Sequence, residues 1–377
     1  MSDCLNFAWL NLRRGDRLRV LVAVAGAGVA IFVVLLHLAF LRAVQDKASQ
    51  VYDLFDADVV LVSDRFQFLY NMPEFPVARL RQANSHPAVA GVGAVSIASS
   101  HWQAPETEAV SSLMLIGLDV GPDFIRDGVL RALLPNLKKP RRILMDRYSD
   151  PGVGRLEVGL VGRIRSQSAT VAGLYGLGLP MYAAATAMVS HTDFSLYTGQ
   201  SPQRIQLGLL QLKPGSDAAR VAAELSTDLP HDVRALTLRA LRVREQDYFV
   251  EVKPLGVMMR FGLLVGLIVG AVALFQALGS QMETRLRDFA VLRAMGFSSW
   301  FVYGVGALQL LLMSFLAFAL AWIAAIPVFA LIERLTHLSL PTDPHLLLSA
   351  GLLCLPMIAT AAWPVLRAGR ADPASLF

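Results

Sequence analysis

The chain has 377 residues, of which 55% are hydrophobic and only 17% are charged. A soluble domain rarely reaches that balance, so the composition indicates a membrane protein. The formal net charge of +5 is small for this length, and no run of Lys and Arg interleaved with aromatic residues occurs, so the sequence offers no nucleic-acid-binding surface.

The two cysteines, Cys4 and Cys354, both lie outside the long middle region of the chain. A domain formed by that region therefore folds without disulfides. Two cysteines are also too few for a cysteine-based metal site, and His86, His101 and His231 stand at spacings that no metal motif uses. The sequence predicts no metal site.

Residues 1–19 are predicted to form a cytoplasmic amphipathic segment. Leu5, Trp9 and Leu12 share one face of a helix, and arginines follow them. An apolar face beside basic residues is typical of a helix that lies in the membrane interface.

Four apolar runs are long enough to cross the roughly 30 Å of hydrocarbon, which takes about 20 helical residues. We assign transmembrane helices to residues 20–41, 256–280, 300–332 and 346–366. The first run is too long for a signal peptide and has no A-x-A cleavage site at its end, so we interpret it as a retained anchor. The third run is longer than a span needs and should tilt or project beyond the bilayer.

The placement of arginines predicts the orientation of these helices. Four arginines precede the first helix, three lie between the second and third, and two follow the fourth. If every run spans, the three clusters fall on one side, which the positive-inside rule makes the cytoplasm. Both termini are then cytoplasmic. The loop 281–299 and the tail 367–377 share that side, whereas residues 42–255 and the short loop 333–345 lie outside.

The external segment alternates strand-like and helix-like patterns. Strand-like runs bounded by turn residues cover residues 56–63, 113–120, 141–146 and 205–212. Amphipathic helical patterns cover residues 76–84 and 123–134, and Ser216 is placed to cap a third helix. We therefore predict a membrane protein with four transmembrane α-helices, one plus three, and a large α+β extracytoplasmic domain inserted between helices 1 and 2.

The external domain shows no catalytic constellation. His191, Asp193 and Ser195 stand together in the stretch "HTDFS", but the members of a catalytic triad are assembled from distant segments. We therefore predict a non-catalytic membrane subunit.

The second apolar run carries Gly262, Gly266 and Gly270 at four-residue spacing, which places them on one face of a helix. Small residues at this spacing let another helix approach closely. Either another helix of the same chain or a second copy of the chain can fill that face. We favour a second copy, but the sequence leaves both alternatives open.

The sequence contains few groups that could couple a transport step to an energy source. His37 lies near the external end of the first run, where a histidine is more often hydrated than part of a proton relay, and no acidic or basic residue lies deep in any run. The sequence also contains no Gly-Lys pair, so it has no P-loop that could hold nucleotide phosphates. If the protein uses ATP, another subunit binds it.

The cytoplasmic stretch "ETRLRDFAVLRAMGFSS", residues 283–299, is predicted to be a short charged helix ended by Gly296. Leu286 and Phe289 lie near one face, whereas Val291 and Met295 lie near the opposite face. A helix that is apolar on two sides needs burial on two sides. The bilayer surface and a cleft in a protein partner would meet that need.

Two motifs resemble a known family. "RDFAVLRAMGFS", residues 287–298, resembles the R-E-x-x-x-L-[KR]-A-[LM]-G signature of FtsX-type permease domains in MacB-like (type VII) ABC systems. The ending "WPVLRAGRADPASLF" is similar to the family's C-terminus at Pro364, Arg370, Asp372, Pro373 and Phe377. The one-plus-three helix layout with a large first external loop matches that family over the whole chain.

Within that family the chain looks most like the DevC permeases, which have no fused ATPase. It departs from the commonest pattern at Asp288, where Glu is usual, and at Ala290, where MacB itself has Gly. Both departures favour the DevC branch.

The resemblance implies a specific assembly. Two permease copies would pair with two separate ATPase subunits that carry ATP and Mg²⁺, and the chain itself would bind no cofactor. The ATPase-coupling residues implied by the motif are Arg287, Asp288, Phe289, Leu292, Ala294, Met295 and Gly296. In the bacterial inner membrane, the periplasmic domain would act on a membrane-fusion adaptor joined to an outer-membrane channel, which is called mechanotransmission.

Two other functions of related proteins stay open. One is an FtsX-like signal relay that activates a periplasmic hydrolase, although the external domain of such proteins is usually much smaller. The other is lipoprotein extraction of the Lol type. The transported substrate does not follow from the sequence.

Overall fold

The structure is a computed structural model, and it describes residues 17–105, 110–178, 181, 183–284, 298–336 and 338–364. The chain divides into two compact units. Unit 1 comprises Met1–Ala43 and Pro254–Phe377, and unit 2 comprises Val44–Lys253. Unit 2 thus coincides closely with the segment 42–255 that the sequence places between the first two spans.

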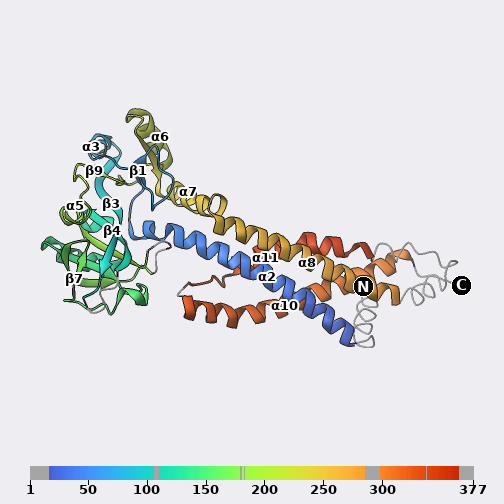
Figure 1. The fold of residues 1–377 in the computed structure, drawn as a ribbon. Helices are drawn as coiled ribbons and strands as arrows, with labels where there is room; N and C mark the ends of the chain where they lie inside the picture. The colour runs from blue at the N-terminus through green and yellow to red at the C-terminus, as the bar shows by residue number, and fades with distance from the viewer. Residues whose placement is uncertain are drawn as a thin grey trace. The chain divides into compact units, whose positions relative to one another are not determined.

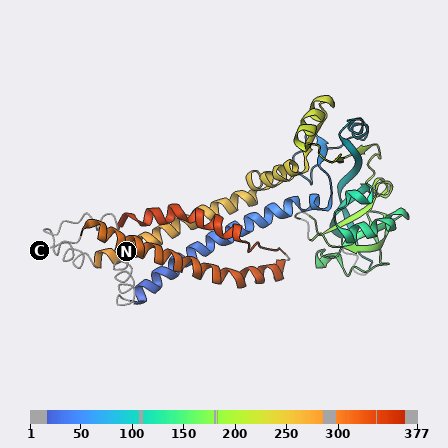
Figure 2. The same cartoon turned by 180° about the vertical axis from the view of Figure 1, so that it is seen from behind.

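Unit 1 is a bundle of apolar helices that run side by side (Figures 1 and 2). Within the described residues, four helices are long and apolar enough to cross a membrane, which confirms the predicted one-plus-three arrangement. Their bounds are α2 (Arg17–Ser49), α8 (Pro254–Thr284), α10 (Ser299–Thr336) and α11 (Pro344–Ala361). The last turns of α2 belong to unit 2.

The helices do not end where their apolar runs end. α2, α8 and α10 all extend beyond the spans predicted at 20–41, 256–280 and 300–332. The backbone hydrogen bonds of a helix do not depend on apolar side chains, so a helix continues until a cap or a turn stops it. α11 begins at such a cap, because Asp343 accepts a hydrogen bond from the Leu346 N–H at 3.1 Å.

Small side chains line the contacts inside this bundle. On α10, Ala317, Ala321 and Ala325 recur every four residues and are all buried. A Cβ added to Gly28 of α2 would lie 3.3 Å from the Ala317 carbonyl oxygen, so the backbones of α2 and α10 approach closely there. This is small-xxx-small packing, which gives apolar helices contact area without a hydrophobic driving force.

Unit 2 is built on a nine-stranded mixed sheet in the order β11-β1-β10-β3-β4-β8-β5-β7-β6. The strands are β1 (Val59–Ser63), β3 (Val89–Gln103), β4 (Val110–Asp119), β5 (Arg142–Asp146), β6 (Val161–Ile164), β7 (Gln167–Tyr175), β8 (Ala185–Ser190), β10 (Leu207–Leu212) and β11 (Val233–Thr237). A separate pair is formed by β2 (Phe75–Pro76) and β9 (Arg204–Ile205). Neighbours in the large sheet are antiparallel, except for the pairs β4–β8 and β5–β7.

One additional pairing closes part of this sheet into a ring. β3 pairs with β6 through Trp102↔Ile164 and Gln103↔Arg163, so the six strands from β3 to β6 form a small barrel. The Trp102 indole fills the interior so tightly that a Cβ on Gly162 would collide with it. This pairing covers the edge that β6 would otherwise leave free, whereas β11 remains an edge strand of the sheet.

Helices cover the open part of the sheet. The α-helices of unit 2 are α3 (Ala78–Asn84), α4 (Gly128–Leu133), α5 (His191–Thr198), α6 (Ala218–Asp228) and α7 (Leu238–Glu251). The 3₁₀ helices are η1 (Gln50–Leu54), η2 (Pro122–Phe124), η3 (Leu134–Lys138) and η4 (Pro151–Val153). Val59 and Leu61 of β1 belong to a core that also contains residues of α3 and α6, whereas Val60 and Val62 belong to a second core that contains Tyr52 and Leu241. β1 is therefore buried on both faces.

Two details of the sequence prediction are corrected by the structure. Residues 123–134 do not form one helix, because the Asp127 carboxylate accepts the Leu130 N–H at 2.6 Å and starts α4 at Gly128. The cap of α6 is Asp217 rather than Ser216, since the Asp217 carboxylate accepts the Ala219 N–H at 2.9 Å. In both places an aspartate supplies the N-cap, and at α6 it takes the position that the sequence had assigned to Ser216.

Candidate functional site

The predicted ATPase-coupling residues lie outside the part of the chain that the structure describes. They are Arg287, Asp288, Phe289, Leu292, Ala294, Met295 and Gly296. The flanking helices are described, and α8 ends at Thr284 whereas α10 begins at Ser299. The motif thus joins the second and third apolar helices of unit 1.

The three glycines of α8 lie against helices of the same chain. A Cβ on Gly262 would collide with the imidazole of His37 on α2, and one on Gly266 would lie 3.2 Å from a methyl group of Val34. A Cβ on Gly270 would lie 3.1 Å from Ala30 and would also collide with Met357 of α11. This is the same-chain alternative of the two left open by the sequence. The homodimer remains a prediction, and these three glycines are not assigned to its interface.

His37 packs as part of this glycine face. Its Nδ1 lies 2.8 Å from the Val33 carbonyl oxygen one turn earlier in α2. Because a carbonyl oxygen only accepts, Nδ1 carries the proton, and the other edge of the ring covers Gly262. The histidine is half-buried, and its position explains why glycine rather than a larger residue stands opposite it.

A polar cluster joins α2 to the start of α11. The Arg42 guanidinium donates to the Asp343 carboxylate at 3.3 Å, to the His345 carbonyl oxygen at 3.1 Å and to the Ser349 hydroxyl at 2.9 Å. Asp343 is also the N-cap of α11. Arg42 therefore fixes α2, at the position just after its apolar run, to the beginning of α11, and no sequence motif pointed to this contact.

The side chains of the "HTDFS" stretch do not assemble into a catalytic triad. Ser195 donates to the His191 carbonyl oxygen at 3.4 Å, and the His191 ring bonds to the Pro202 carbonyl oxygen at 2.9 Å. Asp193 accepts the backbone N–H of Arg141 at 2.9 Å. The Ser195 hydroxyl and the His191 Nε2 thus bond to backbone carbonyl oxygens rather than to each other, and the His191 Nδ1 lies 3.5 Å from the hydroxyl of Ser96, so His191, Asp193 and Ser195 do not form a triad.

Unit 2 contains a fully buried glutamate that the sequence analysis did not single out. Glu245 of α7 accepts the Tyr52 hydroxyl at 3.1 Å and the Leu69 backbone N–H at 2.9 Å. Burial raises the pKa of Glu245 to about 7, against the lowering effect of these two hydrogen bonds. In the sequence, Glu245 could have been noticed only as a single acidic residue on the apolar side of a helix. Its hydrogen-bond partners depend on the tertiary fold.

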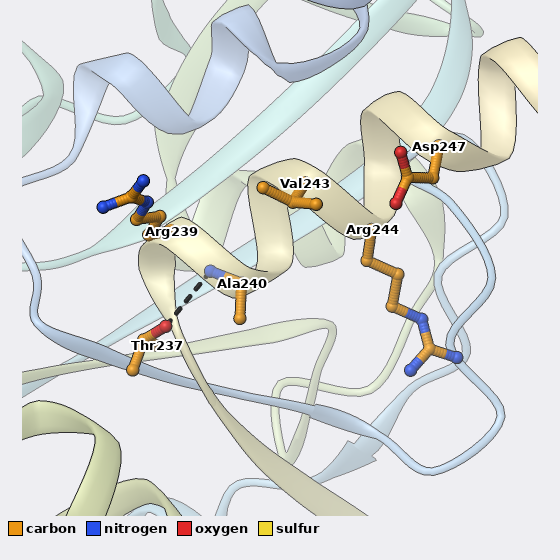
Figure 3. Close-up of a pocket in the computed structure, with 6 residues that line it drawn as sticks. All are labelled: Thr237, Arg239, Ala240, Val243, Arg244 and Asp247. Carbon is orange, nitrogen blue, oxygen red and sulfur yellow. Dashed lines mark hydrogen bonds between the residues drawn. The ribbon is translucent and has the colours of Figure 1, made fainter.

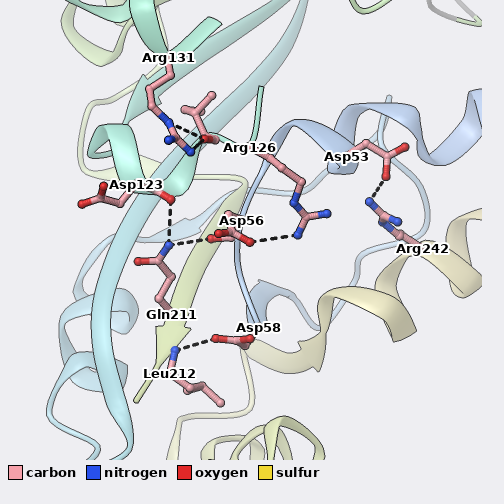
Figure 4. A network of polar contacts seen from close by, with 10 residues as sticks. Asp53, Asp56, Asp58, Asp123, Arg126, Arg131, Gln211, Leu212 and Arg242 are labelled. Carbon is pink, nitrogen blue, oxygen red and sulfur yellow. Dashed lines mark hydrogen bonds and ion pairs between the residues drawn. The ribbon is translucent and has the colours of Figure 1, made fainter. Parts of the chain in front are cut away.

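Glu245 and Tyr52 form one of several residue pairs in an antiparallel contact between α7 and the stretch from α2 to η1. Arg242 pairs with Asp53 (Figure 4), and the Gln246 amide donates to the Ser49 hydroxyl at 3.0 Å. Phe249 packs with Val44 and Ala48. Residue numbers rise along α7 as they fall along its partner, so one face of α7 follows this partner over two turns.

A second buried acid closes the end of β5. Asp146 is fully buried and accepts the backbone N–H groups of Tyr148, Leu177 and Gly178 at 3.1, 3.2 and 2.7 Å. Burial raises the pKa of Asp146, although these bonds and the Lys47 ammonium act in the opposite direction. With three backbone donors satisfied, Asp146 has a structural role in holding the 177–178 turn.

Polar contacts also fix the start of β1. Arg126 pairs with Asp56 at 3.1 Å, and the Gln211 amide donates to the carbonyl oxygens of Asp56 and Asp123 at 3.0 Å each (Figure 4). The Asp58 carboxylate accepts the Leu212 N–H at 2.8 Å. These bonds continue the contact between the two strands where β1 begins and β10 ends, so this network is structural.

The outward face of α7 carries an open surface depression. Figure 3 shows its lining residues, which are Thr237, Arg239, Ala240, Val243, Arg244 and Asp247. Thr237 caps the helix through the Ala240 N–H at 3.1 Å. Arg244 donates to the Phe66 carbonyl oxygen at 3.1 Å. The depression is open to solvent, and its lining carries both basic and acidic side chains. Among the described residues, no group of His, Cys, Asp and Glu could hold a metal ion.

Comparison with known proteins shows that the C-terminal part of the chain is similar to a known family. Residues 260–373 match the family described as the FtsX-like permease C-terminal domain. This range starts in α8 and includes α10, α11 and the predicted coupling segment. No curated protein matches the chain.

Two solved structures are similar to the chain at low identity. The periplasmic region of MacB from Actinobacillus actinomycetemcomitans is 9% identical, covers 51% of this chain and 94% of its own, and has a TM-score of 0.35. The extracellular domain of the ABC-type transporter YknZ from Gram-positive bacteria is 12% identical, covers 48% of this chain and 98% of its own, and has a TM-score of 0.30.

Proposed function

We propose that the chain is the permease subunit of an ATP-driven ABC exporter and that it transmits the motion of a separate ATPase to a partner outside the membrane. The observation that carries this proposal is the match of residues 260–373 to FtsX-like permeases. The match covers the helices on both sides of the charged segment in which the sequence places the ATPase contact.

The position of His37 in unit 1 favours an ATP-driven mechanism over a proton-coupled one. The histidine in α2 hydrogen-bonds its own helix and packs on Gly262, so it is placed as a packing residue. A transporter of this composition needs an external energy source, and its own chain has no phosphate-binding loop.

The close packing around α8 suggests how motion would travel. A force applied at residues 287–296 would act first on α8 and α10. Because Gly262, Gly266 and Gly270 leave no space between α8 and its neighbours, α8 would carry α2 and α11 with it. The finer parts of the proposal follow from the family resemblance. They are a homodimer in the bacterial inner membrane with cytoplasmic termini, ATP and Mg²⁺ on the ATPase, a periplasmic adaptor with an outer-membrane channel, and membership of the DevC branch.

Purification of a tagged chain from native membranes in mild detergent tests the proposal. We expect an ATPase and a membrane-fusion adaptor to co-purify with the chain. An ATPase together with a peptidoglycan hydrolase, and no adaptor, would replace the exporter by a signal relay. An ATPase together with a lipoprotein carrier would favour lipoprotein extraction. Recovery of the chain alone, even after crosslinking, would overturn the ATP-coupled proposal.

A further inference from the structure

The buried Glu245 lies between the two connections of unit 2 to the rest of the chain. The chain enters unit 2 at Val44 within α2 and leaves it at Lys253, just after α7. η1 directly follows α2, and Glu245 of α7 bonds to Tyr52 of η1. We propose that the Glu245 carboxyl is a proton-sensitive latch that holds α7 against η1 when protonated and weakens this contact when ionised.

The Glu245 carboxyl is closed off from solvent, and the hydrogen-bond donors that the structure describes for it are uncharged. Glu245 has no solvent exposure, and its two donors are the Tyr52 hydroxyl and the Leu69 N–H. Both donors are neutral. A buried carboxylate held only by neutral donors is costly, because its desolvation is offset only in part. The neutral acid fits the same space without that cost.

The charged groups around the carboxyl are engaged elsewhere. From η1, Asp53 pairs with Arg242, which lies one turn before Glu245 on α7. From the loop after β1, Phe66 offers its carbonyl oxygen to Arg244 and its ring to the same guanidinium. On α2, the Ser49 hydroxyl accepts a hydrogen bond from the uncharged Gln246 amide. Among the described residues no salt bridge reaches Glu245 itself, so its ionisation is not compensated.

The sign of the pH effect follows from this environment. Burial raises the pKa of Glu245 to about 7, whereas an exposed glutamate titrates near 4.5. The closed contact therefore binds the proton more tightly than the open one does. Opening should rise about tenfold per pH unit between roughly pH 5 and 7 and level off above that range. This inference concerns unit 2 by itself and does not rest on the proposed exporter function.

Hydrogen–deuterium exchange of the full chain in detergent, followed by mass spectrometry from pH 5 to 8, tests the latch. The peptides to follow contain Leu69, Tyr52 and residues 242–250, with exchange corrected for the intrinsic pH dependence of the chemical rate. We expect the wild-type opening to increase at least tenfold over this range. Glu245→Gln, which still accepts hydrogen bonds but does not ionise, should show no increase.

Two further variants make the result decisive. Asp247→Asn removes an exposed acid two residues further along α7 and should leave the pH dependence unchanged. Tyr52→Phe removes one of the two donors to the carboxylate, so it should increase opening more at pH 8 than at pH 5. Equal pH dependence in the wild type and Glu245→Gln overturns the latch. If Glu245→Gln does not fold, a Tyr52→Phe profile identical to that of the wild type overturns it.

Discussion

The imidazole of His37 occupies the space that a side chain on Gly262 would need. The two residues lie on α2 and α8, which are adjacent in the bundle although more than 200 positions separate them. This relationship gives a specific reason for the glycine, since any larger residue must displace a ring that is itself hydrogen-bonded to Val33.

Gly262→Ala should destabilise the bundle by overpacking, which typically costs about 1–3 kcal/mol. Gly26→Ala on α2 is the matched control, because nothing lies within 4 Å of a Cβ at that position. Thermal unfolding of the purified chain in detergent measures both. His37→Ala should rescue Gly262→Ala in the double variant, and an additive double variant would contradict the collision.

Arg42→Ala should loosen the attachment of α2 to α11. The variant loses three hydrogen bonds at once, and partly exposed charged contacts of this kind contribute roughly 1 kcal/mol together. Asp343→Asn keeps an N-cap for α11 while it removes the ion pair, so we expect a smaller loss. The unfolding midpoint in detergent separates the two variants. An equal or larger effect of Asp343→Asn would mean that the ion pair with Asp343, not the bonds of Arg42 to His345 and Ser349, dominates this contact.

The stability of unit 2 should decrease as pH rises above the acidic range. Burial raises the pKa of both Glu245 and Asp146, so each carboxyl binds its proton more tightly in the folded chain than in the unfolded chain. The folded state is therefore favoured at low pH, and for Glu245 this advantage disappears between pH 4.5 and about 7. Thermal unfolding at pH 5 and pH 7.5 checks the direction. Glu245→Gln should show a smaller difference between the two pH values, and an undiminished difference would assign the effect to other groups.

Leu292→Asp should uncouple the ATPase from the permease without unfolding it. The residue lies in the charged segment that the family motif assigns to the ATPase cleft, and an ionised carboxylate there would have to be buried on docking. We expect loss of ATPase association in pull-down experiments, with an unchanged unfolding midpoint. Ala290→Ser is a conservative control substitution in the same segment. Normal association of Leu292→Asp would move the docking site elsewhere.

Much of the architecture was predictable because it depends on local composition. The four apolar runs correspond to α2, α8, α10 and α11, and the prediction of a large α+β domain between the first two is confirmed. Segment 56–63 contains β1, since a run of β-branched residues bounded by turn residues is informative over a few positions. The prediction failed at residues 123–134 and at Ser216, where neighbouring aspartates supplied the caps.

The sequence by itself determined the membrane character, the number of apolar helices and the family motif around residues 287–296, because hydropathy and a short motif are properties of contiguous residues. Only the tertiary structure decided what covers Gly262, where Arg42 binds and that Glu245 is buried against Tyr52. Those contacts join residues far apart in the chain, and the free energy of burying or pairing a side chain depends on which distant neighbours the fold brings to it.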